Sequence, residues 1–173
     1  MWHIISTIFP YAVAFAMPLL ITSLGGLYSE RSGVVNIGLE GLMVIGSFAS
    51  SITTVALYPV LGTGAVWVSL IAAMAAGAFF SLLHAFASVS LNANQVISGT
   101  ALNMIAGALT IYLARAITGS GNIQIQQGLP RIDIPVLVHI PLLGPLFFKQ
   151  TYGSTWLILC ILAAAAWVLY KTP

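Results

Sequence analysis

Long apolar runs with hardly any charge among them constrain this chain more than any other feature. Hydrophobic residues make up 60% of its 173 positions, and charged residues make up only 5%. A soluble domain carries about a quarter charged residues, so this composition leaves too few to cover a globular surface in water. A run of roughly 20 apolar residues is long enough to cross a bilayer as a helix. We therefore expect an all-α fold, a polytopic transmembrane bundle of about five spanning helices.

Short stretches rich in polar residues, proline or glycine separate the apolar runs. Pro10 and Pro18 predict a kink or a break in the first span. The prolines of residues 118–150 forbid one long helix, so we expect a non-spanning loop there. We expect residues 1–173 to form a single transmembrane domain. The expected spans cover about residues 8–28, 34–57, 65–89, 95–117 and 152–170.

Side chains that carry chemistry are few and scattered. Cys160 is the only cysteine, which excludes an intrachain disulfide and a cysteine-based metal site. His3, His84 and His139 lack metal-ligand spacing, and we expect His84 to be a hydrogen-bonded or interfacial histidine. No phosphate-binding glycine-rich loop is present. We therefore expect no enzymatic activity and no cofactor, and the net charge of +2 gives no reason to expect nucleic acid as a partner.

The second apolar run contains a carboxylate, that of Glu40. Placing a carboxylate at bilayer depth costs roughly 2.5–3.5 kcal/mol, so this side chain should face protein or water. If this helix begins near residue 33, Asn36, Glu40, Ser47 and Ser51 lie within about 60° of one another at ~100° per residue. They then form one polar stripe on an apolar helix. Two interpretations are equally favoured: the stripe lines a pathway, or it forms hydrogen bonds that fix helix packing. We expect Glu40 to face the interior of the bundle.

The fourth run repeats this pattern. Its polar and small residues share a face of about 120° at ~100° per residue: Gln95, Gly99, Asn103, Gly107 and Thr110. Glycines spaced by four residues allow a neighbouring backbone to approach closely. Close packing is therefore the favoured role of the glycines, and Asn103 either bonds across that contact or faces a solute path.

Three strings extend this interpretation to a family. They read GGLYSERSGVVNIGLEGLM over residues 25–43, NQVISGTALN over residues 94–103 and PLLGP over residues 141–145. Together they resemble the membrane permease subunits of ABC importers for nucleosides, within the broader group that serves sugars and branched-chain amino acids. The likeness runs in collinear order along essentially the whole chain.

The resemblance implies a division of labour in a cell membrane. A permease of this kind pairs with a second permease subunit, a cytoplasmic ATPase subunit and an external substrate-binding lipoprotein, within the lipid bilayer. It makes Asn36, Glu40, Gln95 and Asn103 candidates for the translocation pathway. Phe48 and Tyr112 are candidate aromatic partners for a nucleobase, although no spacing argument favours either.

Length and orientation also follow from the resemblance. Family members are longer, and their loop that couples to the ATPase follows a Lys-Thr-Pro like residues 171–173, so we expect this chain to be the N-terminal part of a permease. Basic residues in the loops favour an N-terminus inside by a margin of one. The resemblance instead places Lys171 inside, which with five spans puts the N-terminus outside, and we follow the resemblance.

Three alternatives stay open. One is an ABC permease for sugars or branched-chain amino acids. Another is a secondary transporter or channel that uses Glu40 as an ion or proton site, although such transporters carry inverted repeats and no second copy of the first string is seen. The last is a membrane interaction subunit that transports nothing.

Overall fold

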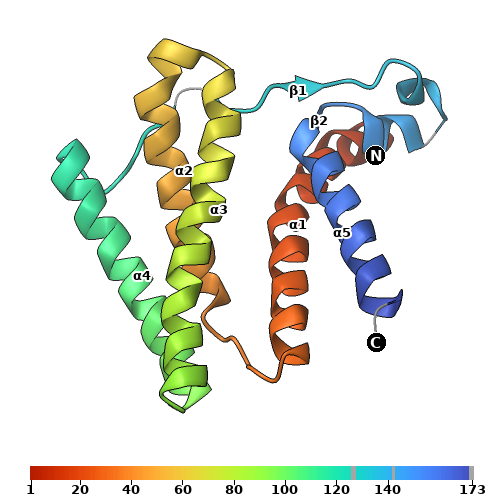
Figure 1. Cartoon of the computed structure of the whole chain (residues 1–173). Coiled ribbons are helices and arrows are strands. Elements are labelled where there is room, and N and C mark those ends of the chain that lie inside the picture. The colour runs from red at the N-terminus through yellow and green to blue at the C-terminus, as the bar shows by residue number, and fades with distance from the viewer. Residues whose placement is uncertain (126–127, 142, 172–173) are drawn as a thin grey trace. The chain divides into compact units, whose positions relative to one another are not determined.

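The computed structural model describes residues 1–125, 128–141 and 143–171. In this part of the chain five long helices follow one another, as Figure 1 shows: α1 (Trp2–Arg31), α2 (Leu39–Leu61), α3 (Gly64–Ala85), α4 (Gln95–Thr118) and α5 (Gly153–Lys171). A π-helix, η1 (Phe86–Ser90), extends α3. The other short elements are β1 (Arg131–Ile132), η2 (Leu137–His139), η3 (Gly144–Phe148) and β2 (Thr151–Tyr152).

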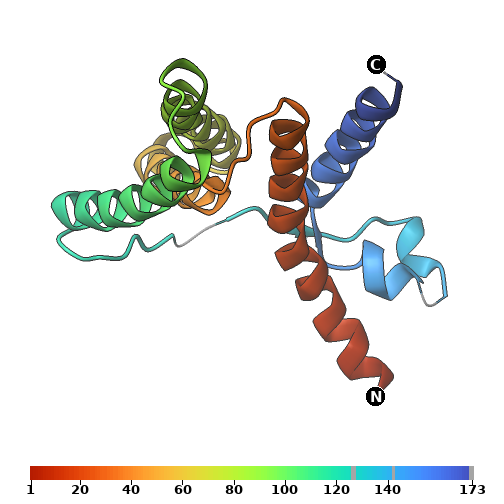
Figure 2. The same ribbon diagram turned by 90° about the horizontal axis from the view of Figure 1, so that it is seen from below.

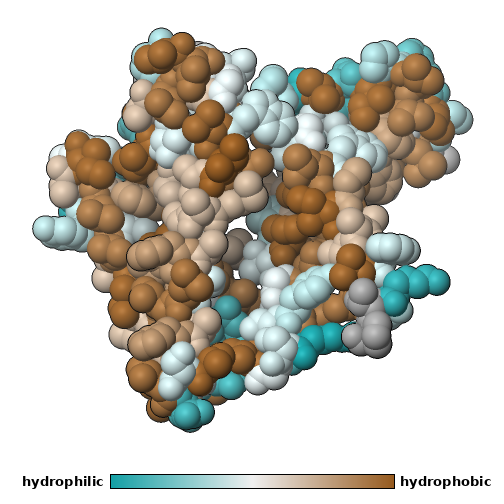
Figure 3. Space-filling view, viewed as in Figure 1, coloured by the Kyte–Doolittle hydropathy of each residue, from teal (hydrophilic) through white to brown (hydrophobic). Residues whose placement is uncertain are grey.

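All five helices are long and apolar enough to cross a membrane. Their order and approximate bounds agree with the five expected spans, so the prediction of an all-α, polytopic membrane protein is confirmed. Large apolar side chains such as Phe79 and Leu82 are exposed, and hydrophobic residues cover much of the helices in the space-filling view (Figure 3). Exposed apolar side chains are what lipid-facing helices require.

Of the kink or break expected in the first span, the break is absent. The helix α1 continues through both Pro10 and Pro18, since membrane helices tolerate the loss of the hydrogen bonds that proline removes, and Figure 2 shows α1 bent along its length. One local expectation is wrong. The second span is shifted towards the C-terminus. It begins at Leu39 rather than at residue 34, and it continues past the expected end at residue 57 to Leu61.

The described chain forms two compact units, one of residues Gly25–Gly128 and one of residues Met1–Leu24 with the chain after Gly128. In the first, small residues bring α2 and α3 together. Ser50 donates a hydrogen bond to Ser69 across the two helices at 3.2 Å, and a Cβ on Gly46 would lie 3.4 Å from the carbonyl oxygen of Ala73. Small side chains are typical of close helix contacts in membranes.

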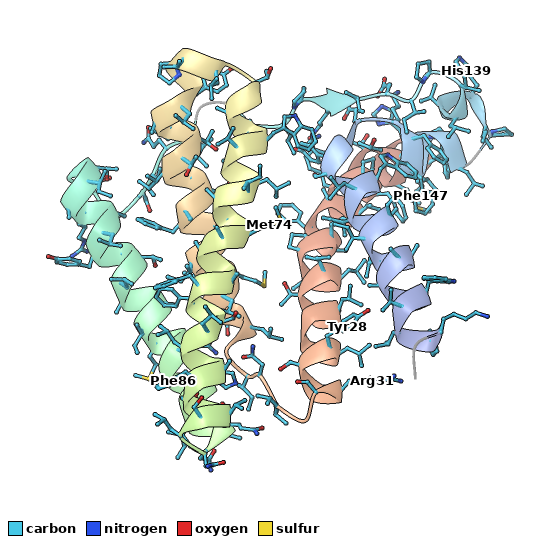
Figure 4. All side chains as sticks on the ribbon, viewed as in Figure 1. Tyr28, Arg31, Met74, Phe86, His139 and Phe147 are labelled. Atoms are coloured by element: carbon cyan, nitrogen blue, oxygen red, sulfur yellow. The ribbon has the colours of Figure 1, made fainter. Side chains whose placement is uncertain are left out.

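In the second unit, β1 pairs with β2 in antiparallel register, with Arg131 opposite Tyr152. The guanidinium of Arg131 lies 4.0 Å from the ring centroid of Tyr11, and its Nε donates to the Tyr152 hydroxyl at 3.0 Å. The hydrogen bond to Tyr152 is the largest cause that raises the pKa of Arg131, and a hydrogen bond to Tyr11 is the next. Phe147 of η3, labelled in Figure 4, packs edge-on against Phe9 of α1.

Candidate functional site

Residues 33–38, which join α1 to α2, are not helical and lie against the start of α4. We refer to them as the 33–38 segment. The Gln95 side chain accepts a hydrogen bond from the Val35 amide at 2.7 Å and reaches the Gly33 carbonyl at 3.5 Å. His84, which is only 3% exposed, lies 3.3 Å from the Val35 carbonyl and 2.7 Å from the Ser98 hydroxyl. One amide and one imidazole therefore fix the segment to α3 and α4, and the expectation of a hydrogen-bonded His84 is confirmed.

Asn103 continues this arrangement further along α4. Its Oδ1 accepts a hydrogen bond from the Gly41 amide at 2.7 Å, and its Nδ2 donates to the Ile37 carbonyl at 3.1 Å. Gly41 lies in the first turn of α2, and the first amides of a helix lack partners within the helix. The side chain of Asn103 therefore caps the N-terminus of α2 from a neighbouring helix.

Asn36 does not belong to the predicted stripe on α2, because it precedes the helix. Its Oδ1 accepts a hydrogen bond from the Gly38 amide at 2.9 Å, a local side-chain bond of the kind that competes with helix formation. Gly33 has a φ of 86°, a left-handed conformation that favours glycine. These two features delay the start of the helix, so that Ser47 and Ser51 share α2 with Glu40 but not with Asn36.

The glycines at the contact between α2 and α4 differ from those further along α4. A Cβ on Gly99 would lie 2.9 Å from the backbone nitrogen of Gly38, and a Cβ on Gly41 would lie 2.9 Å from the Cα of Asn103. Both positions therefore serve the close approach of two backbones. By contrast, a Cβ on Gly107 would meet no atom within 4 Å, so in the described chain Gly107 does not take part in the expected seam.

Glu40 is the second residue of α2, and its side chain is exposed on this chain. A carboxylate in the first turn interacts favourably with the positive end of the helix dipole. Glu40 is close in sequence to the 33–38 segment, and Asn103 caps the same helix end. The four predicted pathway residues are thus grouped around the start of α2.

A groove lies between α2 and α4, further along both helices. Its volume is about 210 Å³, and its polar lining comes from Ser47, Ser51, Thr110 and Asn122, with the ring of Phe48 in the wall. Figures 1 and 2 show α4 close to α2 at the start of α4 and diverging from it towards the end of α4. The divergence of two membrane helices exposes polar groups that a parallel pair would cover.

No group of three metal-ligating side chains was found among the described residues. The chemistry at hand is that of hydroxyl, amide and aromatic groups, together with one carboxylate, and these groups bind polar solutes by hydrogen bonds and stacking.

The family described as the permease component of the branched-chain amino acid transport system matches residues 8–173. The chain belongs to this family. Five spanning helices agree with that membership, and we conclude that the chain is a multi-pass membrane protein and a permease component.

Several curated permeases are similar to this one. The guanosine ABC transporter permease protein NupQ of Bacillus subtilis is 45% identical over 99% of this chain and 54% of its own length. The nucleoside ABC transporter permease protein NupC of Lactococcus lactis is 39% identical over 91% of this chain and 50% of its own. A putative glucose ABC transporter permease protein of Haloferax volcanii is 35% identical over 92% of this chain and 46% of its own length. This chain therefore spans about half the length of the curated relatives it matches. No solved structure gives a significant match.

The groove is the feature of this permease component that sequence reasoning does not find. Periodicity identifies Ser47 and Ser51 as polar positions on α2, but it does not predict that Phe48 lines a site with them. Their neighbours on the other wall are more than fifty residues away in sequence, and helical periodicity relates only positions on one helix.

The motif string of residues 141–145 includes position 142, and the string of residues 171–173 includes 172 and 173; these positions lie outside the described residues.

Proposed function

We propose that this chain is a membrane-spanning permease subunit of an ABC importer and forms part of the pathway by which nucleosides cross the cell membrane. The observation that carries the proposal is the 45% identity to a guanosine permease over 99% of this chain. The five spanning helices supply the membrane passage that such a role requires.

Transport of this kind is divided among several proteins. In our proposal a second permease subunit completes the pathway, a cytoplasmic ATPase subunit hydrolyses ATP, and an external substrate-binding lipoprotein delivers the solute. The N-terminus lies outside and Lys171 lies inside. The permease itself carries out no catalytic step.

Within the pathway, the four residues around the start of α2 have two kinds of role. We infer that Asn36, Gln95 and Asn103 hold the 33–38 segment and the end of α2 in place, since their side-chain amides bond to the backbone there. Glu40, which is exposed next to them, faces the pathway and attracts polar groups of the solute.

Uptake of radiolabelled guanosine tests the proposal. Cells that contain the chain with its transporter partners are compared with cells in which only this chain is deleted. We expect deletion to remove most of the ATP-dependent guanosine uptake, with little effect on glucose or leucine uptake. Loss of glucose uptake in its place would favour a sugar permease, which the similarity to the Haloferax volcanii protein supports.

The energy source of uptake distinguishes an ABC importer from a secondary transporter. Uptake that persists when the partner ATPase is inactivated, but stops when the proton gradient is collapsed, would indicate a secondary transporter that uses Glu40. Guanosine uptake that is unchanged by the deletion would contradict any transport role of this chain in nucleoside import.

A further inference from the structure

One wall of the groove comes from the middle of α2, and the other comes from the last turns of α4 and the stretch that follows it. At ~1.5 Å of rise per residue, Ser47 and Ser51 lie about 12 and 18 Å from the start of α2, a helix about 34 Å long. Thr110 of α4 faces the same groove. The hydrocarbon core of a bilayer offers no hydrogen-bond partner, so polar groups in the middle of a spanning helix match a polar occupant better than they match acyl chains.

The four polar side chains of the groove differ in their hydrogen bonds. The Ser51 hydroxyl donates to the Ser47 carbonyl at 2.7 Å, and the Thr110 hydroxyl donates to the Ala106 carbonyl at 2.8 Å. In contrast, the side chains of Ser47 and Asn122 are exposed, with no such bond to the part of the chain described. They can both donate and accept hydrogen bonds, whereas the other two hydroxyls keep lone pairs that accept.

Phe48 adds a flat apolar surface to these groups. Its ring is half-buried in the wall of the groove, next to Ser47 and Ser51. An aromatic ring pairs well with a second flat ring by offset stacking or edge contact. A ligand that matches the groove therefore has a flat ring with amide-like groups and hydroxyl groups beside it.

We propose that this groove is a contact site for a nucleoside during its passage, with the base against Phe48 and the polar edge of the solute bonded to Ser47 and Asn122. The inference rests on the proposed function and adds the place of contact. The volume of about 210 Å³ is below the ~300–1,000 Å³ of typical ligand pockets, so the groove holds part of the solute. Weak contact of this kind suits a pathway, because a transported solute must also leave.

Cysteine labelling tests access and occupancy. In a Cys160→Ser background, which contains no other cysteine, Ser47→Cys is treated in membranes with a water-soluble thiol reagent. The membranes contain the whole transporter. We expect labelling, and we expect guanosine at millimolar concentration to slow it, because a solute in the groove shields the thiol. Glucose serves as the solute control. Absence of labelling, or labelling that guanosine does not slow, overturns the proposal.

Substitution of the ring tests its role. Phe48→Leu is expected to reduce guanosine uptake by about three- to tenfold, and Phe48→Tyr is expected to restore it, since the ring is kept. Phe79→Leu is the matched control, because Phe79 carries the same ring and is 66% exposed on α3, but is not among the residues that line the groove. Equal uptake in Phe48→Leu and the parent chain overturns the proposal, as does an equal loss in Phe48→Leu and Phe79→Leu.

The proposed function and the proposed contact site fail in different ways. If the parent chain with its partners takes up no guanosine, the proposed function fails and this inference fails with it. If the parent chain takes up guanosine, but Ser47→Cys is not protected and Phe48→Leu transports normally, only the groove loses its assigned role.

Discussion

At the scale of single residues, contact between α4 and the backbone around the start of α2 depends on positions without a side chain. Gly38 lies opposite Gly99, and the two backbones approach so closely that a Cβ on either would meet the other. Small residues permit such contacts in membranes, where dispersion and hydrogen bonds rather than the hydrophobic effect hold helices together. The spacing of glycines on α4 predicted a contact, and the structure shows that Gly99 makes it.

Gly99→Ala is therefore expected to destabilise the chain, while Gly107→Ala on the same helix is expected to be neutral or slightly stabilising. The added methyl at position 99 would meet the backbone of Gly38 at 2.9 Å, whereas no atom lies within 4 Å at position 107. Overpacking of this kind costs about 1–3 kcal/mol, and the helix preference for alanine over glycine returns ~1 kcal/mol at both sites. Thermal unfolding in detergent measures the difference. Equal midpoints for the two variants would contradict the close approach.

At the scale of elements, the start of α2 is decided by partners outside the helix. Asn36 bonds to Gly38 just before the helix, and Asn103 of α4 accepts from Gly41 within its first turn. A capping bond is usually local in sequence, but here the acceptor lies 62 residues away. The stability of α2 and the position of α4 are thereby linked.

Asn103→Ala is expected to lower the free energy of unfolding by about 1–2 kcal/mol, since it removes a cap and leaves the Gly41 amide without its acceptor. Thr100→Ala is a suitable control on the same helix, because within the described part of the chain the Thr100 hydroxyl bonds only to the α4 backbone. Hydrogen exchange measures the effect locally: the Gly41 amide should exchange faster in Asn103→Ala and at the parent rate in Thr100→Ala. Unchanged exchange at Gly41 in both variants would argue against the cap.

At the scale of the whole molecule, the proposed topology, in which all five helices span the membrane, puts Trp2 and Lys171 on opposite sides. The turn between α3 and α4 then shares a side with the end of α5, and the stretch after α4 lies on the other side. The charge distribution is too even to orient these helices, because loops with few basic residues give the positive-inside rule little to act on.

Accessibility to an impermeant maleimide tests the proposed orientation in the Cys160→Ser background. Ser120→Cys, just after α4, is expected to react in intact cells. Ala93→Cys, in the turn before α4, is expected to react only after the membrane is permeabilised. Both positions are exposed in the structure, which makes them matched reporters. The reverse pattern would place the N-terminus inside and support the weak charge preference.

The sequence by itself determined the class of protein and the number and order of its spans. Apolar runs of this length have one stable solution in a bilayer, because every backbone amide must find a partner within its own helix. It also determined family membership through strings such as that of residues 25–43. The end of α4 was predictable to one residue, since a helix that stops at a left-handed glycine, here Gly119, follows a local rule.

Only the tertiary structure decided where α2 begins and what the polar residues touch. The predicted stripe assumed a helix from residue 33, but Asn36 and Asn103 set its start at Leu39 through bonds of which one is distant in sequence. The groove likewise has one wall from residues 44–51 and another from residues 110–123. A periodic pattern specifies one face of one helix, while a site between helices depends on the angle at which they pack, and that angle arises from contacts such as Gly38 against Gly99.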